Sequence, residues 1–168
     1  VGLIDAPEHV TAQAFKSAGD VIVLAGPVLH PKCADLSLGA SHFVKVTRGE
    51  KAGRTPNLDY ALEKGVQSAV RELIQAGLVR SAHDCSEGGL AVALAESSMS
   101  STDQLGATIE FPSGPALDKY PAAVARAALL FGESQSRIIL SVSPEHADAV
   151  LEKLKAHGLP HSRIGTIG

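Results

Sequence analysis

An octapeptide near the middle of the chain, His83-Asp84-Cys85-Ser86-Glu87-Gly88-Gly89-Leu90, combines ionisable side chains with two adjacent glycines. Residues 78–82 before it are predicted to form a short strand, and a helix is predicted to begin within it at Ser86 or Gly88. A polar turn that joins a strand to a helix is typical of a domain in which helices cover a sheet.

Strand and helix patterns alternate on both sides of this octapeptide. Short apolar segments predict strands at residues 1–4, 20–26, 42–47, 107–111, 137–142 and 162–167. Capping residues and apolar stripes predict further helices at residues 5–19, 57–76, 122–131 and 143–158. Because the alternation is irregular, we expect an α+β (α/β layered) fold, a mixed β-sheet covered by helices, rather than a regular parallel sheet.

The composition indicates one domain with an aliphatic core. Of the 168 residues, 45% are hydrophobic but only 4% are aromatic, so Val, Leu, Ile and Ala must fill the interior. The net charge is −3 without any basic tract, which argues against nucleic acid as a partner. No apolar run approaches the roughly 20 residues that cross a bilayer, so we expect no membrane association.

Cysteine and histidine spacing indicates neither a disulfide framework nor a metal site. Cys33 and Cys85 are far apart in sequence. Surface positions are expected for the histidines outside the octapeptide, which are His9, His30, His42, His146, His157 and His161. The chain starts Val1-Gly2-Leu3-Ile4-Asp5 without Met or a signal-peptide pattern, so we expect a cytoplasmic domain that begins inside a strand, through cleavage or excision.

The octapeptide is a candidate binding site for a phosphate group. The first amides of a helix have no partner within the helix and carry partial positive charge. Gly88 and Gly89 allow a ligand to approach the backbone, and Ser86 can donate its hydroxyl to a phosphate oxygen. Asp84 can hold a ligand hydroxyl, an ammonium or a hydrated magnesium ion, while His83 can bind the phosphate or orient Asp84.

Two other interpretations of the octapeptide stay open. In the first, Ser86 only caps the helix, the glycines permit a tight turn and His83 satisfies a backbone carbonyl; the negative charges of Asp84 and Glu87 favour this interpretation. In the second, Cys85 or Ser86 is a nucleophile activated by His83. Because neighbours in sequence seldom meet with triad geometry, and because cysteine often serves as a small packing residue, the second is the less favoured.

A second candidate segment, Phe131-Gly132-Glu133-Ser134-Gln135-Ser136-Arg137, directly precedes a predicted strand. Glu133 can pair with Arg137 or contact a ligand, and we take Glu133, Ser134 and Gln135 as secondary candidates for substrate binding. The alternative is a helix end at Gly132 followed by a polar turn.

The two segments together resemble the phosphoribosylformylglycinamidine synthase family. Residues 81–96, Ser-Ala-His-Asp-Cys-Ser-Glu-Gly-Gly-Leu-Ala-Val-Ala-Leu-Ala-Glu, look like a signature of its second half, although the family usually has Asp in place of Glu87. Residues 130–137, Leu-Phe-Gly-Glu-Ser-Gln-Ser-Arg, match a later motif of the same family. Residues 1–26 resemble the passage from its ATP-binding domain into its C-terminal domain.

The resemblance implies a domain of the aminoimidazole ribonucleotide synthetase type. Other members of this superfamily are thiamine-monophosphate kinase, selenophosphate synthetase and a hydrogenase maturation factor. In each, an N-terminal domain binds ATP and magnesium and a C-terminal α/β domain closes the site. Residues 1–19 are then expected to end the preceding ATP-binding domain or to connect to it, and residues 20–168 to form the C-terminal domain.

The resemblance also implies an activity for the full-length enzyme. It is an ATP-dependent carbon–nitrogen ligase that converts formylglycinamide ribonucleotide and glutamine into formylglycinamidine ribonucleotide, with ammonia from a glutaminase component. The magnesium-binding acids, the catalytic histidine and most ATP contacts belong to the N-terminal domains. We therefore expect no catalytic residue, no metal ligand and no synthase activity in this chain alone.

Three roles for the chain follow from these observations. It is a substrate-binding domain of the synthase, or a structural and assembly domain of the same enzyme or of another superfamily member. The third role, a small-molecule hydrolase centred on Cys85 or Ser86, has the weakest support.

Overall fold

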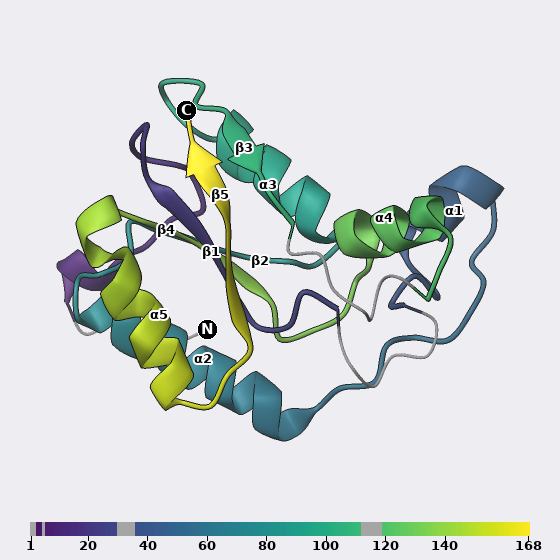
Figure 1. Cartoon of the computed structure of the whole chain (residues 1–168), viewed down its shortest axis with the longest axis horizontal. Coiled ribbons are helices and arrows are strands. Elements are labelled where there is room, and N and C mark those ends of the chain that lie inside the picture. The colour runs from purple at the N-terminus through teal and green to yellow at the C-terminus, as the bar shows by residue number, and fades with distance from the viewer. Residues whose placement is uncertain (1–2, 5, 30–35, 112–118) are drawn as a thin grey trace.

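The computed structural model of the chain describes residues 3–4, 6–29, 36–111 and 119–168. Five strands form one sheet in the order β2-β4-β1-β5-β3 (Figure 1). The strands are β1 Val21–Ala25, β2 Ser81–Asp84, β3 Ala107–Ile109, β4 Ile138–Val142 and β5 His161–Ile167. The α+β class is therefore confirmed.

The sheet is antiparallel in all of its described strand pairs, not mixed as expected. Strand direction depends on which strands become neighbours. Here β2 lies beside β4 and β1 lies beside β5, although long connections separate each pair in the sequence. Hydrophobic patterns mark where strands occur but carry no information about such pairings.

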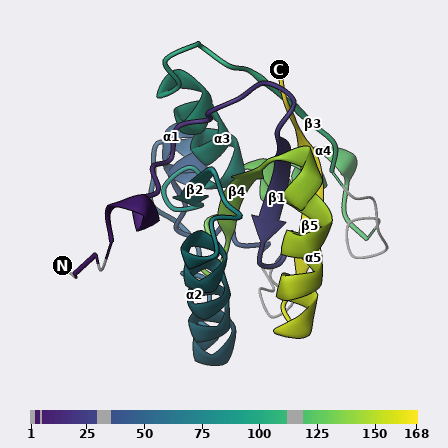
Figure 2. The same cartoon turned by 90° about the vertical axis from the view of Figure 1, so that its left-hand side faces the viewer.

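Helices cover both faces of the sheet. The helices of the described residues are α1 His42–Arg48, α2 Tyr60–Gln75, α3 Gly89–Met99, α4 Ala122–Phe131 and α5 Ala147–Ala156, with short 3-10 turns at Pro7–His9 and Pro144–His146. Helices α2 and α5 stand side by side against one face, and α3 lies on the other (Figure 2). No helix in the described part of the chain is long and apolar enough to cross a membrane.

The central strand β1 supplies both cores, because its successive side chains point to opposite faces. Val21, Val23 and Ala25 pack with α2 and α5. Ile22 and Leu24 pack with α3 and with residues of the N-terminal segment. All five side chains are buried, so the strand fixes the two helical layers relative to each other.

The predicted strand at residues 42–47 is wrong, because this segment forms helix α1. The β-branched residues favour a strand, but local capping decides the outcome. The Ser41 hydroxyl accepts a hydrogen bond from the Val44 amide at 3.3 Å, and Gly49 ends the helix in the left-handed conformation. None of the α1 residues is buried. An extended conformation of this segment would therefore gain no stability from burial against a sheet face.

The predicted helix at residues 5–19 is also wrong in the described residues, where only the turn Pro7–His9 is helical. The following segment hydrogen bonds to other elements instead. The Phe15 amide donates to Ser97 of α3 at 3.0 Å, and the Ala12 carbonyl accepts from the Ala82 amide of β2 at 3.1 Å. Residues 3 and 4 are not in a strand, and the expected cap Asp5 lies outside the described residues.

The remaining elements were predicted with small shifts at their ends. Helix α4 was predicted with the observed bounds, and α2 begins at its Asp59 cap rather than at residue 57. The strand expected at 78–82 forms later and includes His83 and Asp84. The helix expected from Ser143 divides into a 3-10 turn and α5, and the Ser143 side chain makes no capping hydrogen bond.

Candidate functional site

The two candidate segments meet at one end of strands β2 and β4. These strands are antiparallel neighbours, and Asp84 at the end of β2 pairs with Ile138 at the start of β4. The next residue along, Cys85, donates its amide to the Arg137 carbonyl at 2.9 Å. Because one strand ends where the other begins, the loop after β2 and the loop before β4 lie side by side.

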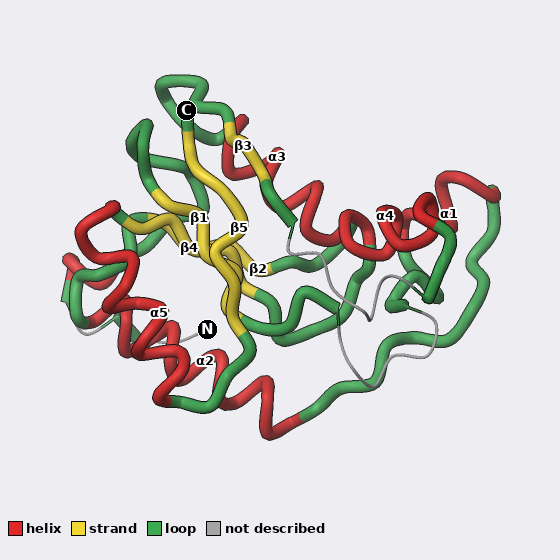
Figure 3. Tube along the Cα trace, in the orientation of Figure 1, coloured by secondary structure: helices red, strands yellow, loops and turns green. Residues whose placement is uncertain are grey.

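The two loops and the first half of α2 line a hollow of about 490 Å³. Its lining residues are Glu63, Val66, Gln67, Asp84, Cys85, Ser86, Glu87, Glu133, Ser134, Gln135, Ser136, Arg137 and Ile138. Residues 85–88 and 132–137 lie in loops and turns, which are green in Figure 3. The hollow therefore contains members of both segments that were singled out from the sequence.

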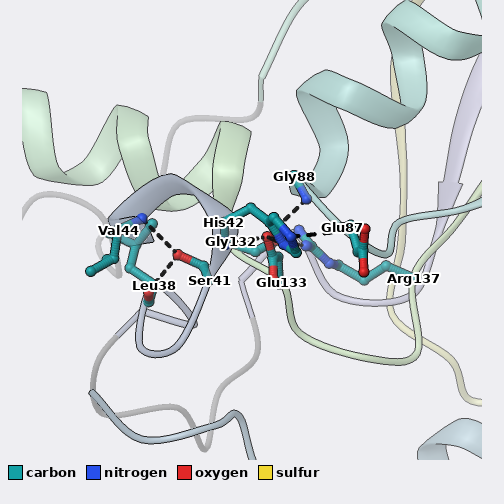
Figure 4. Close-up of polar contacts among 9 residues, drawn as sticks. All are labelled: Leu38, Ser41, His42, Val44, Glu87, Gly88, Gly132, Glu133 and Arg137. Carbon is teal, nitrogen blue, oxygen red and sulfur yellow. Dashed lines mark hydrogen bonds and ion pairs between the residues drawn. The ribbon is translucent and has the colours of Figure 1, made fainter. Parts of the chain in front are cut away.

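Glu133 makes the central polar contacts of this site. One carboxylate oxygen, Oε1, accepts hydrogen bonds from the backbone amides of Gly88 and His42, both at 2.8 Å (Figure 4). The His42 ring lies beside the same oxygen, with Nδ1 at 3.4 Å. The side chain of Glu133 is only 16% exposed. Glu133 thus joins the starts of α1 and α3, and its charge suits the partial positive charge of the α3 start.

Gly88 and Gly89 have conformational and steric reasons to be glycine. Both adopt left-handed backbone conformations, with φ of 80° and 67°. A Cβ on Gly89 would lie 2.6 Å from the Gly132 carbonyl oxygen, because the start of α3 packs against the end of α4. The Gly88 amide donates to Glu133 and the Gly89 amide donates to the Ser86 carbonyl at 3.1 Å. These two amides therefore already have partners within the protein.

His83 is held by a carboxylate of α3 rather than by a backbone carbonyl. Its Nε2 lies 2.8 Å from Glu96 Oε2, and its Nδ1 lies 3.7 Å from Asp84 Oδ1. The His83 side chain is 13% exposed, whereas that of Asp84 is 71% exposed and lines the hollow. At 3.7 Å the contact to Asp84 is too long for a hydrogen bond, so the orienting role of His83 stays a prediction, and the Asp84 side chain faces solvent.

The arrangement does not favour a nucleophilic triad. Cys85 is 5% exposed, and burial raises the pKa of its thiol to about 11, with a smaller opposing effect of Arg137. A protonated, buried thiol is a poor nucleophile. Ser86 is exposed, and no hydrogen bond of the described residues joins its hydroxyl to His83.

The second segment is braced by Arg137. This buried guanidinium donates from Nη2 to the Gly132 carbonyl and from Nε to the Ser134 carbonyl, the latter at 3.4 Å. Ser134 is buried and Gln135 is exposed. The Ser136 hydroxyl donates to Glu63 Oε2 at 2.6 Å, which ties the turn to α2.

Four carboxylates face the hollow, those of Glu63, Asp84, Glu87 and Glu133, against the single buried guanidinium of Arg137. Such surroundings disfavour a bare phosphate and suit hydroxyl groups, ammonium groups or an anion that arrives with its own counter-charge. The described residues contain no group of three or more side chains arranged to hold a metal ion.

Comparison with known proteins identifies the family. Residues 17–168 match the family described as AIR synthase related protein, C-terminal domain. The chain belongs to this family. Among curated relatives of the domain, the phosphoribosylformylglycinamidine synthase subunit PurL of Alkaliphilus metalliredigens is 39% identical over 99% of this chain and 20% of its own length. PurL of Moorella thermoacetica is 42% identical over 100% of this chain and 21% of its own length.

Solved structures share the fold of this chain. T. maritima PurL complexed with FGAR superposes with a TM-score of 0.74 at 26% identity, over 96% of this chain and 26% of that one. Thiamine-monophosphate kinase from Stenotrophomonas maltophilia K279a shares the fold, with a TM-score of 0.57 at 19% identity, over 94% of this chain and 50% of that one. The chain spans about a fifth of the length of the curated relatives it matches.

Three residues of the site were missed from the sequence alone. His42 was expected only at the surface, although its amide and ring both lie beside Glu133. Glu63 was not singled out, and Ser136 was quoted only as part of its segment. No spacing signal could have linked them, because His42 and Glu133 are 91 positions apart in sequence.

Proposed function

We propose that this chain is the C-terminal domain of a phosphoribosylformylglycinamidine synthase, the ATP- and glutamine-dependent ligase implied by the sequence resemblance. The curated relatives cited above are PurL subunits of that enzyme, at about 40% identity over nearly the whole chain. The structure with the TM-score of 0.74 is a PurL complexed with FGAR. The whole reaction belongs to the longer protein, and we expect this chain alone to be inactive.

One observation carries the proposed role of this domain, which is to form a wall of the ribonucleotide site. The two segments that carry the family resemblance, residues 81–96 and 130–137, meet around the same hollow although they are remote in sequence. Asp84 and Ser86 present exposed polar side chains there. The Asp84 carboxylate is suited to accept hydrogen bonds from ribose hydroxyls, and the Ser86 hydroxyl to donate to a phosphate oxygen.

The acidic lining limits what this domain does by itself. With several carboxylates around the hollow, a phosphate needs positive charge from elsewhere in the longer protein. The described residues show no metal-binding group that fits magnesium, so we assign no step through a metal to this domain. ATP and magnesium are proposed for the N-terminal domains of the longer protein; a T. maritima PurL complexed with ATP contains a domain with the fold of this chain, with a TM-score of 0.65.

The partners proposed for the longer protein are formylglycinamide ribonucleotide, its own N-terminal ATP-binding domains and a glutaminase component in the cytoplasm. A T. maritima PurLQS structure contains a domain of the same fold, with a TM-score of 0.64. We propose neither nucleic acid nor membrane as a partner.

The role in substrate binding is tested in the full-length protein with the variants Asp84→Asn and Ser86→Ala. Loss of a hydrogen bond to a charged group weakens binding by roughly 10-fold or more, so we expect KM for formylglycinamide ribonucleotide to rise at least that much. Glu152→Gln, on the exposed side of α5, is the matched control. An unchanged KM in both site variants would contradict the proposed role.

A structural or assembly role is the second candidate, because the Gly88 amide is already bonded to Glu133. In that case the same variants would keep normal kinetics, and changes at this loop would alter assembly with the glutaminase component. Size-exclusion chromatography of the full-length variants with that component distinguishes the two roles.

A further inference from the structure

We propose that Glu133 is a positioning residue, a fixed internal anion that holds the loop Ser86–Gly88 in place at the edge of the hollow. The kinetic part of its test rests on the proposed function, whereas the structural part does not. The sequence suggested a contact between this carboxylate and a ligand, which stays a prediction, whereas the contacts of its Oε1 support an internal role.

The geometry of the Glu133 carboxylate supports an internal role. A carboxylate oxygen has two acceptor directions, and Oε1 receives the amides of Gly88 and His42 at 2.8 Å each. Its partners come from chain positions 45 and 91 residues away. One oxygen atom therefore connects three segments that are far apart in the sequence: the start of α1, the start of α3 and the segment that contains Glu133.

The surroundings keep this carboxylate in place. The side chain is 16% exposed, and the His42 ring lies next to it with Nδ1 at 3.4 Å from Oε1. The other nitrogen of the His42 ring, Nε2, lies 3.9 Å from the Glu87 carboxylate. Hydrogen bonds from amides to a charged acceptor are strong when water is largely excluded, so the contact resists replacement by solvent.

The contact matters for the loop because two adjacent residues of its backbone are glycines. Gly88 and Gly89 follow one another, and both occupy left-handed conformations. Without a Cβ, glycine visits many conformations, so the position of Ser86 before the pair depends on contacts outside the loop. Glu133 also supplies the negative charge at the start of α3 that a bound phosphate would otherwise provide. A ligand phosphate is thereby directed to the side chains before Gly88 rather than to its amide.

The structural test uses Glu133→Ala and measures whether a small carboxylate replaces the lost one. We expect a lower Tm for this variant and a recovery of Tm in sodium formate relative to sodium chloride at equal ionic strength. The wild type should show no such difference. The amide signals of His42 and Gly88 should move in the variant and return toward their original positions with formate. Equal responses to formate and chloride, or unmoved amide signals, would overturn the proposal.

Glu133→Gln decides the question if the alanine variant does not fold. The glutamine keeps an acceptor oxygen at the same place but loses the charge, so the Gly88 amide signal should shift while the Tm changes little. In the full-length enzyme we expect this variant to raise KM for formylglycinamide ribonucleotide several-fold, with a smaller change in kcat. An unshifted Gly88 signal, or an unchanged KM in an active synthase, would overturn the proposal. If the protein shows no synthase activity at all, the proposed function fails and the formate and amide measurements still decide the role of Glu133.

Discussion

The sheet face that carries α2 and α5 differs in kind from the end of the molecule that carries α1 and the two loops. Helix α2 buries Val66, Ala69, Val70 and Leu73, whereas α1 buries none of its residues. The first region is held by apolar packing, whereas the second combines one aromatic stack, Phe43 on Phe131, with hydrogen bonds to charged groups such as Glu133 and Arg137. The domain therefore combines a stable scaffold with a site whose shape depends on single polar contacts.

The largest effect is expected from Leu73→Ala, which tests the apolar face. Leu73 is fully buried in the cluster of α2 and α5. Truncation of a buried leucine costs about 2–5 kcal/mol in free energy of unfolding. Urea unfolding of the chain measures it, and Val46→Ala on α1, where the side chain is 79% exposed, is the control. If both variants lost the same stability, the contrast between the two regions would be wrong.

The reactivity of Cys85 gives the next largest effect and tests where the apolar interior meets the loop. Its pKa of about 11, against an ordinary value of 9.0, leaves roughly 100-fold less thiolate at pH 8 than a free cysteine has. In a Cys33→Ser background, we expect a disulfide reagent to label Cys85 only after addition of urea. Rapid labelling of the native chain at pH 8 would revive the nucleophile hypothesis.

Gly89→Ala compared with Gly77→Ala isolates close packing at the loop end. Both glycines have nearly the same φ, 67° and 69°, so the conformational strain is matched. A Cβ at Gly77 meets nothing within 4 Å, whereas one at Gly89 meets the Gly132 carbonyl. We expect the Gly89 variant to lose about 1–3 kcal/mol more stability, as overpacking usually costs. If urea unfolding showed the same loss of stability in both variants, the contact between α3 and α4 would adjust to a Cβ at residue 89 at little cost.

The smallest effect on stability is expected from Asp20, and it should be visible only in the pH dependence of Tm. Burial raises the pKa of this carboxyl, opposed by Arg80, whose Nη1 lies 3.0 Å from Oδ1. The folded chain then holds this proton more tightly than the unfolded chain, so stability falls as pH rises above about 3.8 through the folded pKa. The Tm advantage of the wild type over Asp20→Asn should shrink across this range, and Asp148→Asn is the exposed control. If the Tm difference between the wild type and Asp20→Asn grew with rising pH, the pKa of Asp20 would be lowered by folding and not raised.

The contrast between the two regions also explains which features the sequence could predict. The apolar stripe of α2 and the continuous apolar run of β1 are both visible in the sequence, so the two elements were predicted to within a few residues of their observed ends. Helix α1 was mistaken for a strand because none of its residues is fully buried and its stability comes from local contacts, namely the Ser41 cap, the Glu133 contact and the stacking of Phe43 on Phe131.

Some residues that line the hollow could be singled out from the sequence, but their contacts could not. The chemistry of Asp84, Ser86 and Glu133 could be proposed from residue type, and all three line the hollow. That Glu133 would bond to Gly88 depends on how α4 and β4 are placed beside α3, which only the folded chain determines. The antiparallel pairing of β2 with β4 could not be predicted from the sequence for the same reason.

The hydrogen bond between Ala82 and Ala12 has a consequence for solubility. Strand β2 stands at the edge of the sheet, and an uncovered edge offers unpaired amides and carbonyls to strands of other molecules. The segment around Ala12 covers part of that edge, with its carbonyl accepting from the Ala82 amide at 3.1 Å. Residues 1–19 were expected to end the preceding ATP-binding domain or to connect to it, and within them the Ala12 carbonyl forms a hydrogen bond with the sheet. A version of the chain shortened beyond Ala12 would expose the edge and favour aggregation through strand pairing.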